Sequence, residues 1–487
     1  MPFWGSMTRR SILTPWRNGR DAMASRAAAT VRTWQIFGRS HDKARMTSKF
    51  SLIGSGLAGG LLAAFLGRRG YEVELFERRP DPRAGNTVGG RSINLALSTR
   101  GIHALEQLGV AREVLQHAIP MRGRMIHDKS GALHFSPYDR DPNKCINSIG
   151  RGALNTVVIE AAQRYPNVRV RFNHRCTEVD LDTPAAQLVQ VETNEIVESR
   201  ADAIIGVDGA FSAVRRSMQK LDRFEYSQSY LAHGYKELTI PPAADASWQM
   251  EKNALHIWPR KSFMMIALPN PDGSFTCTLF WEFEGPRSFA TTTSDSEVRR
   301  FFEEEFPDAV ALMPALLQDF RDNPTGSLVT IRCAPWCYED KLALVGDAAH
   351  AVVPFYGQGM NAAFEDCVVF DECLAQFPND RKRAFDEYFA RRKANADALA
   401  DLAVENFVEM RDKTASHAFR AKKKLDHTLE GLLPGIYLPR YTMVTFTLIP
   451  YADAASRARR QDRIVYGGLV ALLGVLVLLL LLLTRLL

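Results

Sequence analysis

Three glycines and one acid form the most informative chemical pattern in the chain. Gly54, Gly56 and Gly59 lie in a turn after the apolar run 50–53, and Glu77 ends the next apolar run. Between a strand and a helix, such glycines allow a tight turn, the approach of a pyrophosphate to backbone amides, and close helix packing. An acid about 20 residues later can accept hydrogen bonds from an adenosine ribose. The pattern predicts a dinucleotide site; the alternative is a glycine-rich βαβ turn without a ligand.

Two later segments repeat the form of an apolar strand that ends in an aspartate before a helix. The first ends in Gly-Val-Asp-Gly with Asp208, and the second ends in Gly-Asp with Asp347. Either aspartate could serve as a helix N-cap. Three motifs in this order resemble those of the single-component FAD-dependent aromatic hydroxylases. The resemblance implies that Asp208 lies near the pyrophosphate and the route of NADPH, and that Asp347 holds the ribitol chain of FAD.

The same resemblance implies that FAD is bound and that NADPH docks transiently. No second dinucleotide motif is visible in the sequence, which agrees with transient docking. The predicted FAD-binding residues are Gly54, Gly56, Ala58, Gly59, Glu77, Arg78, Ala96, Arg151, Asp208, Asp347, Met360 and Asn361. Around Arg151 the family usually has Asn-Arg-Asp or Ser-Arg-Glu, whereas this chain has a glycine on both sides. No catalytic acid or base is predicted, and His350 is interpreted as a structural histidine beside the flavin.

Longer strings narrow the resemblance to the members of this family that act on kynurenine. These strings span residues 90–97, 121–127, 233–238, 255–259, 354–361 and 441–446. They imply that L-kynurenine is hydroxylated to 3-hydroxykynurenine with NADPH and O2, through a flavin C4a-hydroperoxide.

Kynurenine carries a carboxylate and an aniline ring, so its site needs a cation and an apolar slot. Arg124 suits the first task because a guanidinium binds a carboxylate through two parallel hydrogen bonds. By resemblance, the predicted substrate-binding residues are Arg124, Tyr138, Asn406, Tyr441, Phe280, Phe355 and Met410. The alternatives are a surface cation at Arg124 and ordinary core aromatics at Tyr138 and Tyr441.

The composition agrees with a large enzyme. The 487 residues, 46% of them hydrophobic, allow up to three domains. The net charge of +6 arises in the Arg-rich first 46 residues, so the rest of the chain is nearly neutral and nothing indicates nucleic-acid binding. The seven cysteines are scattered and odd in number, and no metal site is predicted from them.

We predict an α/β fold, with a Rossmann-like FAD-binding domain, an inserted antiparallel β-sheet substrate domain, a C-terminal helical region and one C-terminal transmembrane helix. Turn dipeptides at 259–260 and 272–273 separate strand-like runs in the inserted domain. The predicted parts are an N-terminal extension at 1–46, an FAD-binding domain at 47–116, 145–222 and 334–375, a substrate domain at 117–144 and 223–333, a helical region at 376–455, and an anchor at 464–484.

Both ends of the chain contain candidate targeting segments. Residues 464–484 are uncharged and, at about 1.5 Å per residue, long enough to cross a bilayer, which predicts a tail anchor in contact with lipid. The resemblance points to the mitochondrial outer membrane with the catalytic domain in the cytosol, and the endoplasmic reticulum is the alternative. The Arg-rich stretch before Met46 is either a transit peptide or an extension upstream of the working start.

Two other functional classes stay open at this stage. One is a membrane-anchored flavoprotein epoxidase or reductase acting on an isoprenoid lipid, which would have no need for Arg124. The other is a flavin-fold protein without chemistry, such as the prenyl-protein chaperones that share this topology. The intact Gly56, Glu77 and Asp347 argue against the second class.

Overall fold

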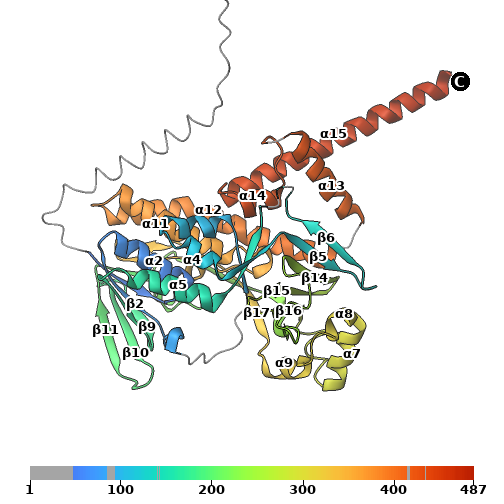
Figure 1. Ribbon diagram of the computed structural model, residues 1–487. Helices are drawn as coiled ribbons and strands as arrows, with labels where there is room; N and C mark the ends of the chain where they lie inside the picture. The colour runs from blue at the N-terminus through green and yellow to red at the C-terminus, as the bar shows by residue number, and fades with distance from the viewer. Residues whose placement is uncertain are drawn as a thin grey trace, which may run out of the picture. The chain divides into compact units, whose positions relative to one another are not determined.

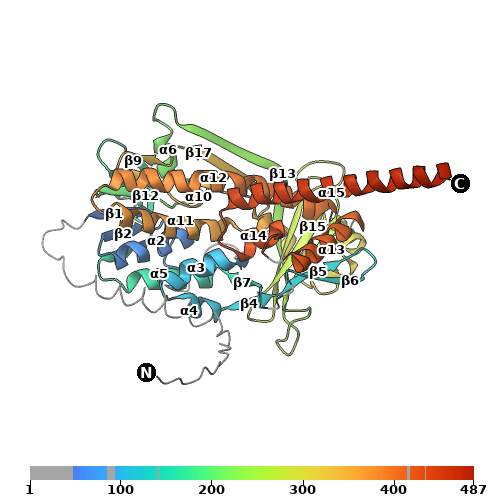
Figure 2. The ribbon, with the colours of Figure 1, turned by 90° about the horizontal axis from the view of Figure 1, so that it is seen from above.

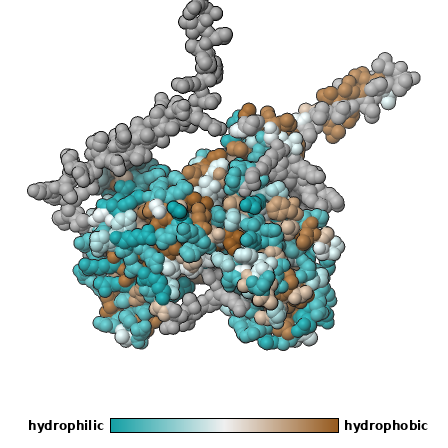
Figure 3. All heavy atoms as spheres, viewed as in Figure 1, coloured by the Kyte–Doolittle hydropathy of each residue, from teal (hydrophilic) through white to brown (hydrophobic). Residues whose placement is uncertain are grey.

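The computed structural model describes residues 48–84, 94–139, 141, 143–413, 417–433 and 435–486. The N-terminal extension predicted at 1–46 lies outside the described residues. Within the described ranges, the strands form four sheets on which the helices pack. On the face shown in Figure 3, hydrophilic residues cover most of the surface, because the apolar side chains fill internal clusters.

The first sheet has six strands in the order β18-β19-β12-β1-β2-β8. In Figure 1 this part of the molecule is found at the label β2, near α2 and α5. These are β1 (Lys49–Ile53), β2 (Glu72–Phe76), β8 (Val168–Arg171), β12 (Ala203–Gly206), β18 (Cys337–Tyr338) and β19 (Leu342–Leu344). All neighbouring pairs are parallel except β18 with β19. The associated helices are α2 (Leu57–Arg68), α5 (Arg151–Gln163), α6 (Ala213–Met218), α10 (Asp347–His350) and α11 (Gly359–Gln376).

This parallel sheet explains why the three flavin motifs meet. The glycine turn follows β1, Glu77 follows β2, Asp208 follows β12, and Asp347 follows β19. The carboxyl ends of parallel strands lie at one edge of a sheet, where α/β proteins bind nucleotides. Motifs that are almost 300 residues apart in the chain therefore come together at one edge.

Two small sheets flank the first one. The antiparallel order β3-β7-β4 joins β3 (Asn94–Leu97), β4 (Ala118–Met121) and β7 (Ile146–Gly150). The antiparallel order β11-β10-β9 joins β9 (His174–Asp180), β10 (Ala185–Gln190) and β11 (Ile196–Arg200). The short helices of this part are η1 (Pro82–Ala84), α3 (Thr99–Gln107) and α4 (Ala111–Leu115).

A seven-stranded sheet in the order β17-β13-β16-β15-β14-β5-β6 forms the second large layer. Its strands are β5 (Gly123–His127), β6 (Leu133–Pro137), β13 (Glu225–Ile240), β14 (Ala254–Arg260), β15 (Phe263–Pro269), β16 (Phe275–Glu282) and β17 (Gly326–Ala334). It is antiparallel apart from the parallel pair β14 and β5. The strand-like runs expected in the inserted domain correspond to β14, β15 and β16. The turn predicted at 259–260 lies inside β14, and the chain turns instead at 261–262.

Consecutive residues of this sheet pack on opposite faces, as the period of a strand requires. Trp281 stacks on Phe301 with ring centroids 4.0 Å apart, in the core formed with α7 (Asp295–Glu305), α8 (Pro307–Val310) and α9 (Leu316–Asp322). The preceding residue, Phe280, instead contacts Phe355 on the other face, with centroids 4.8 Å apart. That second face is the one that carries the predicted ring slot.

The C-terminal part is helical, with α12 lying beside α11 and beside the first part of α15 (Figure 2). Its elements are η2 (Pro354–Tyr356), α12 (Arg381–Val408), the π-helical turn η3 (Glu409–Lys413), α13 (His417–Leu432), α14 (Arg440–Phe446) and α15 (Tyr451–Leu486). Leu402 of α12, Val444 of α14 and Tyr451 of α15 share one buried apolar cluster. This cluster fixes α14 and the first turns of α15 on the rest of the structure.

The prediction of a transmembrane helix at 464–484 is wrong. Among the described residues, no helix combines the length and the apolar character that crossing a membrane requires. The predicted segment is not a separate element but a part of α15, which starts at Tyr451 and also carries Arg457, Arg460 and Asp462. The predicted contact with a lipid bilayer and the predicted location in the mitochondrial outer membrane both require such a helix, so neither prediction is supported.

Candidate active site

The turn between β1 and α2 has room for an anionic ligand. Gly54 has a φ of +108°, a left-handed conformation that favours glycine, and a Cβ on Gly59 would lie 1.9 Å from the carbonyl oxygen of Gly54. A Cβ on Gly56, in contrast, would meet nothing within 4 Å. Gly56 is the N-cap of α2 and no side chain caps this helix. The unpaired amides at the positive end of α2 therefore face open space that fits a pyrophosphate.

Glu77 braces the same turn from the end of β2. Its carboxylate accepts hydrogen bonds from the backbone N–H of Ser55 at 2.9 Å and of Arg79 at 3.0 Å. Each carboxylate oxygen retains a further lone pair that a ribose hydroxyl could use. Ala58 is half-buried on α2, and Arg78 is exposed next to Glu77. The predicted adenosine end of the site is thus assembled from two consecutive strands.

The carboxylate of Asp208 accepts hydrogen bonds from the first turn of the helix that follows it. One carboxylate oxygen accepts hydrogen bonds from the N–H groups of Ala213 at 2.6 Å and Val214 at 3.4 Å. The other oxygen, Oδ1, is buried and has no hydrogen-bond partner among the described residues. Burial is the main cause of the raised pKa of Asp208. The N-cap of α6 is Ser212, so the N-cap alternative does not describe Asp208, and Oδ1 of Asp208 is left for the predicted cofactor role.

Arg151 and Asp347 are brought together from different elements. Arg151 is the first residue of α5 and Asp347 is the first residue of α10, and both side chains are exposed. The surrounding protein displaces water from the Asp347 carboxylate and raises its pKa, and the charge of Arg151 offsets part of that rise. The two residues thus supply a cation and an anion at the same edge of the parallel sheet, next to the glycine turn. The role of Arg151 in binding FAD stays a prediction.

Asn361 has a scaffolding role that the sequence did not reveal. Its Oδ1 accepts a hydrogen bond from the N–H of Ser98 at 2.9 Å, and its Nδ2 donates to the carbonyl oxygens of Ala96 at 2.8 Å and Gly357 at 2.9 Å. This fully buried amide ties β3 to the start of α11. Met360 is half-buried beside it. Direct contact of the Asn361 side chain with FAD stays a prediction.

The substrate cation predicted on β5 lies in an aromatic enclosure. Arg124 is only 8% exposed, and its guanidinium lies 4.7 Å from the ring centroid of Tyr441 and 5.8 Å from that of Tyr138. The two tyrosine rings stack on each other with centroids 5.4 Å apart. Because Arg124 is buried, the alternative of an ordinary surface cation does not describe it. Its neighbour Arg122, in contrast, is exposed.

Two polar groups of this enclosure are available to a ligand. The Nε of Arg124 and the hydroxyl of Tyr138 are buried without a hydrogen-bond partner among the described residues. Burial raises the pKa of Tyr138, so its phenol stays protonated and can donate. Burial alone would lower the pKa of Arg124, but Tyr441, Tyr138 and Glu409 outweigh it and raise the pKa. The site therefore keeps a fixed positive charge beside a neutral donor.

The predicted ring-slot residues share one apolar cluster. Phe280, Phe355 and Met410 are all buried there, and Phe355 also stacks on Phe407 with centroids 4.1 Å apart. Asn406 is buried next to this cluster, and its Nδ2 donates a 2.7 Å hydrogen bond to the carbonyl oxygen of Phe355. Asn406 thus holds the slot in place, and contact of its side chain with substrate stays a prediction.

Comparison with known proteins agrees with this geometry. Residues 48–403 match the family model described as an FAD binding domain. The chain is 48% identical to kynurenine 3-monooxygenase of Myxococcus xanthus (strain DK1622), over 85% of this chain and 89% of the relative. It is also 48% identical to kynurenine 3-monooxygenase of Dictyostelium discoideum, over 84% and 90% respectively. This chain belongs to the kynurenine 3-monooxygenase family. Because the family includes bacterial members, membership does not support a mitochondrial location.

Solved structures of other flavin enzymes resemble this member of the kynurenine 3-monooxygenase family in fold. A tetrameric form of 2-methyl-3-hydroxypyridine-5-carboxylic acid oxygenase matches with a TM-score of 0.61 at 21% identity, over 77% of this chain and 95% of that one. The p-nitrophenol 4-monooxygenase PnpA from Pseudomonas putida DLL-E4 matches with a TM-score of 0.60 at 19% identity, over 79% and 94%. At these identities, the likeness establishes the α/β FAD-binding fold alone.

A buried ionic cluster behind the flavin motifs was missed at the sequence level. His350 is a structural residue in this kynurenine 3-monooxygenase relative, because its Nε2 lies 2.5 Å from a carboxylate oxygen of the fully buried Asp366. Asp366 also accepts the N–H of Gly346 at 3.0 Å, which is the glycine before Asp347. The available signal was the consecutive acid pair 365–366 inside the apolar run 362–370, since buried acids need partners.

Proposed function

We propose that this protein is an FAD-dependent monooxygenase that hydroxylates L-kynurenine to 3-hydroxykynurenine with NADPH and O2. FAD, when bound and reduced by NADPH, supplies the activated oxygen that is transferred to the aromatic ring. The glycine turn, Glu77, Asp208, Asp347 and Arg151 would hold this cofactor. The protein's own task is to orient the substrate ring and to keep water away from it.

One observation carries the proposal more than any other. Arg124 is a buried cation whose Nε has no hydrogen-bond partner among the described residues, and it lies beside the unpaired phenol of Tyr138. A buried charge without full hydrogen bonding is costly, so such a group is retained where a ligand completes it. A carboxylate with a neutral aromatic body matches both the cation and the apolar cluster beside it. Kynurenine has these two parts.

The walls of the site explain how water is kept out. Leu255 and Ile266 pack both against the cluster of Phe280 and Phe355 and against the cluster of Tyr138, so a continuous apolar surface joins the slot to the enclosure around Arg124. A dry environment strengthens the attraction between the guanidinium and a substrate carboxylate. The substrate would therefore be oriented by its carboxylate at one end and by packing of its ring at the other.

The isoprenoid alternative is not favoured. An isoprenoid lipid presents no carboxylate, so it would leave Nε of Arg124 buried without a hydrogen-bond partner. The two relatives at 48% identity are named kynurenine 3-monooxygenases, and the alignments cover 85% and 84% of this chain. A flavin-fold protein without chemistry is likewise not favoured by these relatives.

The test is NADPH oxidation by the full-length, FAD-loaded protein, with chromatographic analysis of the product. We expect L-kynurenine to stimulate NADPH oxidation and to yield 3-hydroxykynurenine in proportion. Decarboxylated kynurenine, which keeps the aniline ring but lacks the carboxylate that Arg124 would bind, is the matched control and should give little stimulation. Equal stimulation by both compounds would refute the role of Arg124, and no hydroxylated product from either would refute the proposed function.

A further inference from the structure

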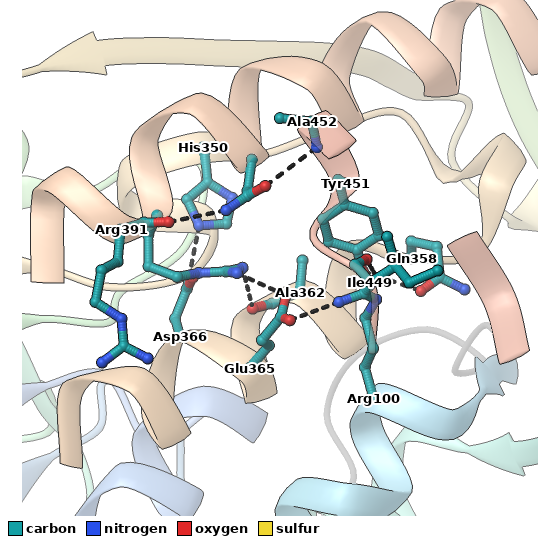
Figure 4. Close-up of polar contacts among 12 residues, drawn as sticks. Arg100, His350, Gln358, Ala362, Glu365, Asp366, Arg391, Ile449, Tyr451 and Ala452 are labelled. Atoms are coloured by element: carbon teal, nitrogen blue, oxygen red, sulfur yellow. Dashed lines mark hydrogen bonds and ion pairs between the residues drawn. The ribbon is translucent and has the colours of Figure 1, made fainter. Parts of the chain in front are cut away.

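A chain of buried charges connects the third flavin motif with the C-terminal helices (Figure 4). At the flavin end, one oxygen of Asp366 accepts the N–H of Gly346 and contacts His350, and the other accepts a 2.6 Å hydrogen bond from Nε of Arg392. Arg392 of α12 also pairs with Glu365 at 2.6 Å. Asp366 and Arg392 are almost completely buried, so the partners define each other's positions.

The second half of this network of buried charges starts at Glu365. The other oxygen of Glu365 pairs with Arg100 of α3 at 2.5 Å, and the Arg100 side chain is fully buried. Arg100 donates to the carbonyl oxygen of Ile449, which lies between α14 and α15, and its guanidinium lies 4.0 Å from the ring centroid of Tyr451. A weaker 3.5 Å hydrogen bond runs from its Nε to the carbonyl oxygen of Val444 in α14.

A third set of contacts connects α15 with the residues before α11, near the predicted flavin site. The hydroxyl of Tyr451 donates a 3.1 Å hydrogen bond to Gln358, which directly precedes α11. Gln358 in turn contacts the hydroxyl of Ser98 at 3.2 Å, and the N–H of Ser98 is held by Asn361. The corner between α14 and α15 is therefore tied to both segments that face the cofactor edge, the turn at Gly346 and the start of α11.

The charges of this chain are balanced, which explains how it persists in the interior. Arg100 and Arg392 oppose Glu365 and Asp366, and each carboxylate bridges two partners. Burial would raise the pKa of Asp366, but His350 and Arg392 outweigh it and lower the pKa. The loss of any one member leaves an uncompensated buried charge on its neighbour, so a disturbance at one end is passed on to the other.

We propose that Arg100 and Arg392 are positioning residues, joined through Glu365 and Asp366, that couple the α14–α15 corner to the flavin turn at Gly346. The α14 helix carries Tyr441, which covers Arg124, so the same chain links the substrate enclosure to the FAD site. This inference deepens the proposed function and rests on it for the role of Tyr441. The claim about FAD does not depend on which substrate is hydroxylated.

The test is a double-mutant cycle read out by FAD affinity, measured from the quenching of flavin fluorescence by apoprotein. The variants are Arg100→Met, Arg392→Met and the double substitution. We expect the Kd for FAD to rise about fivefold or more in Arg100→Met, although Arg100 contacts the α14–α15 corner and not the Gly346 turn. The double variant should bind FAD no more weakly than Arg392→Met alone, because either substitution disconnects the same chain.

A matched control separates coupling from general destabilisation. Arg260, at the end of β14, is a similarly buried arginine outside the network of charges. It donates to the carbonyl oxygens of Glu305 in α7 and His127 in β5. Arg260→Met should lower the thermal stability but change the Kd for FAD by less than twofold. The reciprocal readout is the Kd for L-kynurenine in FAD-loaded Arg392→Met, which should also rise about fivefold.

The outcomes that overturn the proposal are specific. An Arg100→Met variant that binds FAD within twofold of the wild type would refute the coupling, as would a double variant whose effect is the product of the two single effects. If Arg100→Met does not fold, Tyr451→Phe replaces it, because it keeps the ring under Arg100 and removes only the hydrogen bond to Gln358. An unchanged Kd for FAD in Tyr451→Phe would then overturn the proposal.

Discussion

Arg124→Ala should weaken L-kynurenine binding without loss of FAD. The guanidinium is almost fully buried, so its attraction to a substrate carboxylate is little screened by water. Removing one partner of a buried, charge-assisted pair costs about 2 to 4 kcal/mol. At about 1.4 kcal/mol per factor of ten, this corresponds to roughly 30-fold to 1000-fold in affinity. Arg124→Lys should recover only part of the loss, because an ammonium cannot form the two parallel hydrogen bonds of a guanidinium.

The assay is the Kd for L-kynurenine from the change in flavin absorbance of the loaded enzyme. Arg122→Ala is the matched control, because Arg122 lies on the same segment but is exposed, and it should change the Kd by less than about threefold, as expected for a screened surface charge. Tyr138→Phe, which removes one neutral hydrogen bond worth about 0.5 to 1.5 kcal/mol, should fall between the two. A wild-type Kd in Arg124→Ala, or equal effects of the two arginine substitutions, would refute the assigned carboxylate site.

Three further predictions concern the flavin turn and the seven-stranded sheet. Gly56→Ala should leave the thermal stability of the apoprotein unchanged but abolish tight FAD binding. Gly59→Ala should lower the thermal stability of the apoprotein itself, because its Cβ would lie 1.9 Å from a carbonyl oxygen. Thermal melts measure the stability of both variants, and the visible absorbance ratio measures their bound FAD. Glu77→Ala should give folded protein that loses FAD on dilution, and full retention would contradict its role. Burial lowers the pKa of His256 from 6.5 to about 4, so the stability contributed by its neutral form is complete above pH 6.5 and is lost as the pH falls toward 4. About 3 kcal/mol is involved, and His256→Gln should flatten that part of the stability curve in denaturant titrations.

The flavin edge could be predicted from the sequence because its signals are local. Gly54 and Gly59 are needed by a turn of a few residues, and each later motif consists of one strand and the residues directly after it. The parallel sheet then brings these ends together without further information. The alternation of Trp281 and Phe280 between two cores is likewise a local property of a strand.

What could not be predicted depends on partners distant in the chain. The roles of Asn361 and Asn406, which hold backbone carbonyls of other segments, are invisible until the helices are packed. The link of Arg100 to Glu365 joins residues 265 positions apart. The transmembrane prediction is contradicted, because no helix among the described residues is long and apolar enough to cross a membrane, and the run 464–484 forms part of α15.

Arg124 and Tyr441 lie far apart in the sequence, and this separation affects substrate specificity. The apolar slot is built largely by the seven-stranded sheet and η2, and a slot of this kind would accept many flat aromatic rings. Selection for an amino acid requires Arg124 to be shielded from water, and that shield is the ring of Tyr441, supplied by α14 more than 300 residues later. Without it, the attraction of Arg124 for a carboxylate would fall toward the about 1 kcal/mol typical of exposed pairs. In the proposed site, recognition of the carboxylate would therefore depend on how firmly α14 is held, and Arg100, which donates to carbonyl oxygens on the C-terminal side of that helix, is placed to hold it.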